Sequence, residues 1–174
     1  LICESSVPVF DACDDTWSFE AFGLHYDLAA VLDDRGLCPI GWHIASFFDW
    51  FELLEPNPIV SNYQSPSLWQ SGGGSNDSGF SAIPAGVIWP NGTHARGAGE
   101  LAVFWSDYTE CYADIPNCPA QSWVFFMSDN ATSALDNLPN SNVYSIDGSE
   151  VPYPSAGYAE VFQHGGFSIR CLKD

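Results

Sequence analysis

The six cysteines are the residues of this 174-residue chain whose chemistry is best defined by type and spacing. An even number of cysteines in a small domain is typical of disulfide pairing in an oxidising compartment. Zinc binding through thiolates is the alternative, but zinc ligands are typically separated by only about two to four residues. The closest pair here, Cys111 and Cys118, lies further apart. Disulfides are therefore expected, and the residues alone leave their pairing open.

The other groups that could do chemistry form no recognisable catalytic or metal-binding pattern. The sequence has neither a GxSxG nucleophile motif nor the phosphate-binding motifs GxxxxGK and GxGxxG. The Gly72–Gly74 run has no lysine after it and is expected to be a flexible surface loop. The histidines are widely spaced, so no metal site is indicated: they are His25, His43, His94 and His164. We expect no enzyme activity, with hydrolysis by a carboxylate pair as the least favoured alternative.

Three aromatic residues in polar, loop-rich stretches are candidates for binding: Tyr63, Trp69 and Trp89. Exposed aromatic rings stack on sugars and on partner subunits. The alternative is that these rings fasten their loops to the core.

The charge of the chain limits its partners. Four Lys and Arg residues against 22 Asp and Glu residues give a net charge of −18. Such a surface repels phosphate backbones and anionic lipid headgroups, so nucleic acid is not an expected partner. No apolar run approaches the length of a membrane span, so membrane insertion is not expected either. The excess of acid acts as a solubility device or, alternatively, binds cations.

Hydrophobic periodicity predicts an α+β fold with one well-defined helix and many short strands. Ser46 as N-cap and Asp49 three residues later predict a helix over 47–54, with one apolar stripe formed by Phe47, Trp50, Phe51 and Leu54. Residues 22–30 alternate with period two and predict a strand, with a helix through Leu24, Leu28, Val31 and Leu32 as the competing interpretation. Further strands are expected at 7–10, 100–106, 121–128, 142–146, 158–162 and 166–172.

Four segments resemble one family of exported bacterial domains, the Fibrobacter major paralogous domain family. They are RGLCPIGWHIASFFDW at 35–50, SGFSAIPAG at 78–86, VFWSD at 103–107 and GFSIRCLKD at 166–174. The resemblance covers residues 20–174 and leaves 1–19 as a lead-in. It implies a fold similar to C-type-lectin-like domains and to the relatives of the formylglycine-generating enzyme, with short antiparallel strands, one or two helices, long loops and disulfides.

The resemblance also implies how the chain is closed. It implies a Cys38–Cys171 disulfide between the helix entry and the last strand, a Cys111–Cys118 disulfide that closes a short loop, and a Cys3–Cys13 disulfide in the lead-in. Within the shared motifs, His43 is expected to be a buried hydrogen-bonding residue. The tryptophans of these motifs are expected in the core: they are Trp42, Trp50 and Trp105.

Calcium is the one cofactor that the resemblance brings into consideration. C-type lectins that bind sugar hold calcium through Glu-Pro-Asn and Trp-Asn-Asp elements, and this chain has Glu55-Pro56-Asn57 and Trp105-Ser106-Asp107. We interpret the first as a helix stop, because it directly follows the predicted helix. Asp107 remains the candidate ligand for calcium or for a sugar.

These observations together predict a non-catalytic structural or adhesive module at the bacterial cell surface. The chain begins at Leu1 without a leader, as a mature exported chain or a trimmed one would. A lead-in strand carrying Val7, Val9 and Phe10 could add to the sheet of a neighbouring copy and build a multimer or filament. The alternative is a lectin-type module that binds glycan, with or without calcium, through Asp107, Trp69 and Trp89.

Overall fold

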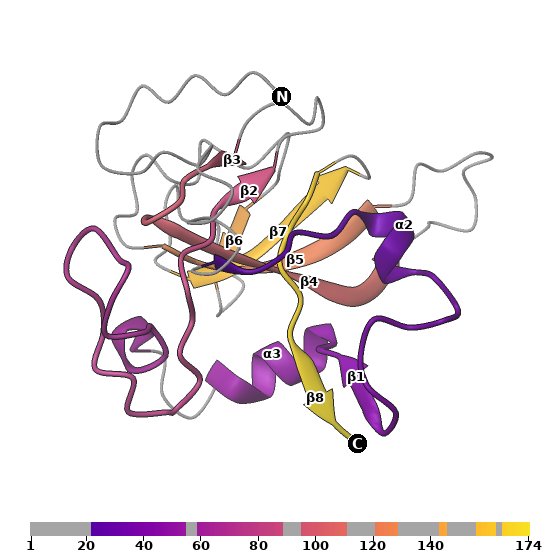
Figure 1. The fold of residues 1–174 in the computed structure, drawn as a ribbon, viewed down its shortest axis with the longest axis horizontal. Coiled ribbons are helices and arrows are strands. Elements are labelled where there is room, and N and C mark those ends of the chain that lie inside the picture. Colours follow the sequence, from indigo (N-terminus) through magenta and orange to yellow (C-terminus); the bar gives the residue numbers. More distant parts are fainter. Residues whose placement is uncertain are drawn as a thin grey trace.

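The structure, a computed structural model, describes residues 22–54, 59–88, 95–110, 121–128, 143–145, 156–162 and 165–174 (Figure 1). This described part combines two short α-helices with short, antiparallel strand pairs, which confirms the predicted α+β class. None of the helices in these ranges has the length and apolar character needed to cross a membrane.

The described elements form three small sheets and two helices. The helices are α2 (Leu28–Val31) and α3 (Phe47–Leu54), with a 3-10 turn, η1 (Val60–Asn62). The largest sheet has the order β4-β5-β7-β6, and the two others are the pairs β1–β8 and β2–β3. The strands are β1 (Trp42–Ile44), β2 (Val87–Ile88), β3 (Ala95–Arg96), β4 (Leu101–Glu110), β5 (Gln121–Ser128), β6 (Val143–Ser145), β7 (Ala156–Phe162) and β8 (Cys171–Lys173).

Helix α3 confirms the prediction from its capping residues. The Ser46 hydroxyl accepts a hydrogen bond from the Asp49 amide at 3.2 Å, and the Asp49 carboxylate accepts one from the Ser46 amide at 2.8 Å. This reciprocal pair satisfies two amides at the start of the helix that have no partner within it. Trp50 and Leu54 lie on the buried side of α3.

The strand predicted over residues 22–30 is wrong, and the competing helical interpretation is right for its second half. Asp27 caps α2 by accepting a hydrogen bond from the Ala30 amide at 2.8 Å. Leu28 and Val31, three residues apart, face the core. The first half forms a single antiparallel bridge, from Tyr26 to Phe167. Over so short a stretch, alternation of apolar residues did not separate a strand from a short helix. The N-cap at Asp27 favours the helix.

Strands β4 and β5 carry the core because both faces of their sheet are covered. On one face, Leu101, Val103 and Trp105 of β4 lie in a buried cluster with Phe167 and with α2. On the other face, Ala102 and Phe104 lie in a second cluster with α3. Alternate residues of a strand point to opposite faces, so burial of both faces requires an almost continuous apolar run. The sequences ELAVFWS and QSWVFFMS have that character.

An aromatic stack ties α3 to this sheet. The indole of Trp50 is stacked on Phe125 of β5, with 4.7 Å between ring centroids, and lies 5.2 Å from Phe104 of β4. Phe80 meets Trp50 edge-on at 5.7 Å, and the guanidinium of Arg170 lies over the Phe80 ring at 4.7 Å. Burial of these rings and their specific geometry make this stack a major contribution to stability.

The segment from Gly165 to Asp174 fastens distant parts of the chain together. Its backbone exchanges hydrogen bonds in turn with Ile88, Tyr26 and β4, and then continues into β8 beside β1. In Figure 1 it runs from the large sheet down to the C-terminus, next to α3. The final strand predicted at 166–172 is thus realised as three bridged residues followed by β8.

In the surface loop expected at 72–74, Gly73 and Gly74 lie close against neighbouring backbone segments. The Gly74 amide donates to the Ser65 carbonyl at 3.1 Å. A Cβ atom on Gly74 would lie 2.0 Å from the Ser61 carbonyl oxygen, and one on Gly73 would lie 2.6 Å from the Pro66 carbonyl carbon. Glycine is needed here because two backbone segments approach too closely for any side chain.

Candidate functional site

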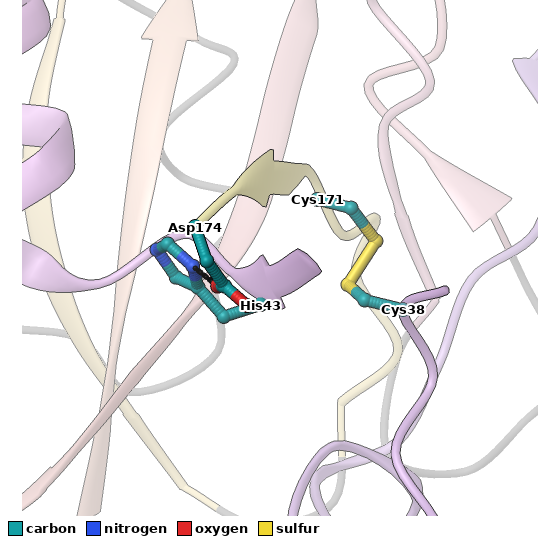
Figure 2. Close-up of a disulfide and its surroundings, with 4 residues drawn as sticks. All are labelled: Cys38, His43, Cys171 and Asp174. Carbon is teal, nitrogen blue, oxygen red and sulfur yellow. Dashed lines mark hydrogen bonds and ion pairs between the residues drawn. A yellow bond between two sulfur atoms is a disulfide. The ribbon is translucent and has the colours of Figure 1, made fainter. Parts of the chain in front are cut away.

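The short ribbon of β1 and β8 is the best-defined site on the surface of the described structure. Trp42, His43 and Ile44 pair with Lys173, Leu172 and Cys171 respectively. Cys38 and Cys171 form a disulfide with their Cα atoms 5.7 Å apart, which is the pairing that the resemblance implied (Figure 2). The bond joins residues separated by 133 positions and so closes almost the whole domain.

His43 links this ribbon to two carboxylates from different elements. Its Nδ1 lies 2.7 Å from the Asp174 carboxylate just after β8, as Figure 2 shows. Its Nε2 lies 3.3 Å from the Asp49 carboxylate on α3. The side chain is 43% exposed. His43 therefore makes hydrogen bonds as predicted, but the expectation that it is buried is wrong.

The surroundings of His43 favour its charged form. The hydrogen bond to Asp174 raises the pKa of His43 above its ordinary value, and the Asp49 carboxylate adds to that effect. Partial burial works to raise the pKa of Asp49, but hydrogen bonds from Ser46 and His43 outweigh it and hold that pKa below its ordinary value. The two carboxylates beside it therefore favour the imidazolium form of His43.

His25 is a contrasting, structural histidine. Burial lowers its pKa below the ordinary value, although hydrogen bonds to the Gly86 and Ala85 carbonyls oppose that shift. Its Nε2 lies 3.2 Å from the Gly86 carbonyl oxygen. A neutral ring that donates there ties the segment before α2 to the one before β2.

The structure describes no preformed metal site. Within the described ranges, no three His, Cys, Asp or Glu side chains are grouped so that they could hold an ion. Asp107, the candidate calcium ligand, lies in β4 where the pairing with β5 shifts register between Trp105 and Thr109. Such bulges redirect side chains and are common beside functional sites. Glu55-Pro56-Asn57 lies outside the described residues.

Two of the predicted binding aromatics are core residues. Tyr63 and Trp69 are each 4% exposed. The Tyr63 hydroxyl donates to the Leu53 carbonyl at the end of α3, and the Trp69 indole donates to the Ala82 carbonyl. Neither ring is free to stack on a surface ligand. Both rings instead fasten their loops to the core, as the alternative interpretation had it.

The remaining predicted site residues and cysteine pairs lie outside the described part of the chain. These are Trp89, Val7, Val9 and Phe10, and the pairs Cys111–Cys118 and Cys3–Cys13. Their predicted roles stay predictions.

The sequence interpretation missed the apolar side chains that the structure exposes. Trp42 was expected in the core and is 44% exposed, whereas Trp50 and Trp105 are buried as predicted. Phe48 and Phe51, three residues apart on the outer side of α3, are 70% and 39% exposed. A signal was present: an eight-residue helix with apolar residues at 47, 48, 50, 51, 53 and 54 cannot bury them all on one side.

Comparison with known families assigns the chain to one of them. The sequence profile described as the Fibrobacter succinogenes major domain matches residues 9–173. The chain belongs to this family. The match supports the predicted bacterial family, and it begins at residue 9, ahead of the motif-based boundary at residue 20. No curated protein and no solved structure gives a significant match.

Proposed function

We propose that this Fibrobacter succinogenes major domain is a non-catalytic, exported module that acts by association at the cell surface, with copies of itself or with another surface component. The observation that carries the proposal is the exposed aromatic face of α3, formed by Phe48 and Phe51. Aromatic side chains that stay in contact with water are favoured at sites of association.

The size of this face sets the strength of the association. At about 150–250 Å² for a whole aromatic side chain, Phe48 and Phe51 together expose on the order of 200 Å². Two such faces in contact would remove roughly 400 Å² from water, which contributes about 10 kcal/mol. Association itself costs about 4–15 kcal/mol in lost freedom of motion. The α3 face alone therefore supports weak binding, and a stable assembly needs a second contact.

The lead-in strand is our candidate for that second contact. In the proposed assembly, Val7, Val9 and Phe10 add to a sheet edge of the next copy while α3 supplies apolar area. The net charge of −18 opposes contact between copies, so added salt should strengthen the assembly by screening it. An assembly held by ion pairs would respond to salt in the opposite way.

The proposal is tested by sedimentation of the full chain over a range of protein and salt concentrations, together with electron microscopy. Association that rises with both concentrations and is weakened by Phe48→Ser supports it. Leu24→Ser is the matched control, because Leu24 is also exposed, at 50%, but precedes α2. A chain that stays monomeric throughout and adheres to no cell surface would exclude the proposal.

We also propose that the fold is C-type-lectin-like. The closing ribbon of β1 and β8, the disulfide beside it and the long segments between short strands support this. An experimental structure with a different strand order around β1 and β8 would overturn it.

Glycan binding is the second candidate function, and the bulge at Asp107 is the observation that favours it. A carboxylate beside a bulge is a reasonable calcium ligand, and calcium requires several oxygen ligands. Binding to a glycan array that is lost with a chelator and with Asp107→Asn would support this function. A blank array with and without calcium would remove it.

A further inference from the structure

The ribbon of β1 and β8 is held by two links of different chemistry, one at each end of β8. The disulfide lies at Cys171, where the strand begins, and the His43–Asp174 contact lies just beyond Lys173, where it ends (Figure 2). Three residue pairs are too few to hold an isolated two-stranded ribbon in water. The two links therefore matter more than the ladder between them.

Protonation of His43 decides how many carboxylates it can hold. A charged imidazole donates from both ring nitrogens, so it binds Asp174 at 2.7 Å and Asp49 at 3.3 Å together. A neutral imidazole donates from one nitrogen only, and its other nitrogen then faces a carboxylate oxygen as a second acceptor. Loss of the proton must release either the contact to α3 or the contact to β8.

The carboxylates near His43 favour its protonated form, whereas the one lysine of the ribbon, Lys173, opposes it. Asp174 faces it from beyond β8 and Asp49 from α3, while Glu52 is exposed one turn further along that helix. Lys173 is paired with Trp42 at the neighbouring position of the ribbon. Asp174 and Asp49 both contact the imidazole, and both favour its protonated form.

We propose that His43 is a pH-sensitive latch that fastens β8 and α3 to β1, and that it sets how often the ribbon opens once the Cys38–Cys171 bond is open. Below the pKa of His43 the latch holds both neighbours. As pH rises through that pKa, the hydrogen bond to Asp174 loses its positively charged donor and weakens, so β8 opens more often. With the disulfide intact, the covalent bond keeps the ribbon closed at either pH.

The test uses the full chain with Cys38→Ser and Cys171→Ser, which opens this bond and leaves the other cysteines unchanged. Hydrogen exchange, corrected for intrinsic rates, is followed at the amides of Ala45 and Asp174, which donate to Arg170 and Gly41 across the ribbon. Exposed ion pairs of this kind change an equilibrium by roughly two- to fivefold. We expect ribbon opening to rise by about that factor between about pH 5 and pH 8.5.

Two variants separate the latch from other effects of pH. His43→Gln in the same background should abolish the pH dependence. Asp33→Asn is the matched control, because it removes a half-buried carboxylate whose partner is Arg35 and not His43, and it should leave the pH dependence unchanged. Equal opening at both pH values before His43 is replaced, or an unchanged response after it, would overturn the proposal.

A second measurement keeps the proposal testable if the cysteine variant fails to fold. In the disulfide-bonded chain, the His43 imidazole is titrated by NMR with and without Asp174→Asn. The replacement should lower the pKa of His43, because it removes the carboxylate that is the main cause of the raised value. An unchanged pKa would show that Asp174 is not held by the imidazole, and the latch would be excluded.

Discussion

Gly74 lies where the loop before β2 folds back on itself, and its replacement by alanine should destabilise the domain more than most surface changes. A Cβ atom there would lie 2.0 Å from the Ser61 carbonyl oxygen and 2.8 Å from Cβ of Gln64. The Ser61 carbonyl also accepts hydrogen bonds from the amides of Ser75 at 2.9 Å and Asn76 at 3.3 Å. Ser61 can therefore move away only by giving up these bonds.

The expected loss follows from these contacts. Overpacking typically costs about 1–3 kcal/mol, and each hydrogen bond lost at Ser61 adds about 0.5–1.5 kcal/mol. Gly74→Ala should therefore lower the free energy of unfolding by about 3 kcal/mol. For a chain of this size that lowers the melting temperature by roughly 6–12 °C.

Gly79→Ala is the matched control, because it separates the clash from the general effect of replacing glycine. Gly79 has a φ of +75° and nothing within 4 Å of its Cβ position, so alanine there meets only backbone strain. That strain costs about 1–2 kcal/mol. Thermal unfolding followed by circular dichroism compares the two variants. If Gly74→Ala is no more destabilising than Gly79→Ala, the close packing of Gly74 is wrong.

Three further predictions concern the closure, the aromatic stack and the cap of α3. Replacing Cys38 and Cys171 with serine should lower the free energy of unfolding by up to about 5 kcal/mol in denaturant titrations, because the bond closes a long loop. Phe125→Ala should cost about 3–5 kcal/mol and alter the fluorescence of Trp50, on which Phe125 is stacked. The depressed pKa of Asp49 adds stability that is present above the ordinary aspartate value and is lost as pH falls through the lowered one, so Asp49→Asn should flatten the acid limb of a pH–stability profile.

Local chemistry made part of this fold predictable. Helix α3 follows from Ser46 and Asp49, and its bounds agree with the predicted residues. Strand β5 also has its predicted bounds, because a short run that is apolar at nearly every position is typical of a strand buried on both faces of a sheet. Strand β4 extends beyond the predicted residue 106 to Glu110, through a bulge that no periodicity reveals.

The parts that could not be predicted depend on contacts between distant segments. His43 meets Asp174 because β1 and β8 pair in one particular register, and nothing near His43 in the sequence specifies that register. Trp69 lies in a polar stretch but is buried, because its indole finds the Ala82 carbonyl thirteen residues away. A buried indole needs such an acceptor, and the sequence does not show where the acceptor lies.

The division of aromatic residues between core and surface changes where a binding function should be sought. Polar neighbours made the loop aromatics Tyr63 and Trp69 look accessible, yet both complete the cluster against α3. Among the residues whose exposure the structure describes, the exposed rings are instead on α3 itself and on β1, at Phe48, Phe51 and Trp42. A buried ring contributes to stability whatever the module binds, whereas a ring contributes less to folding the more of its surface stays in water. Mutations that separate binding from stability should therefore be made at these three positions.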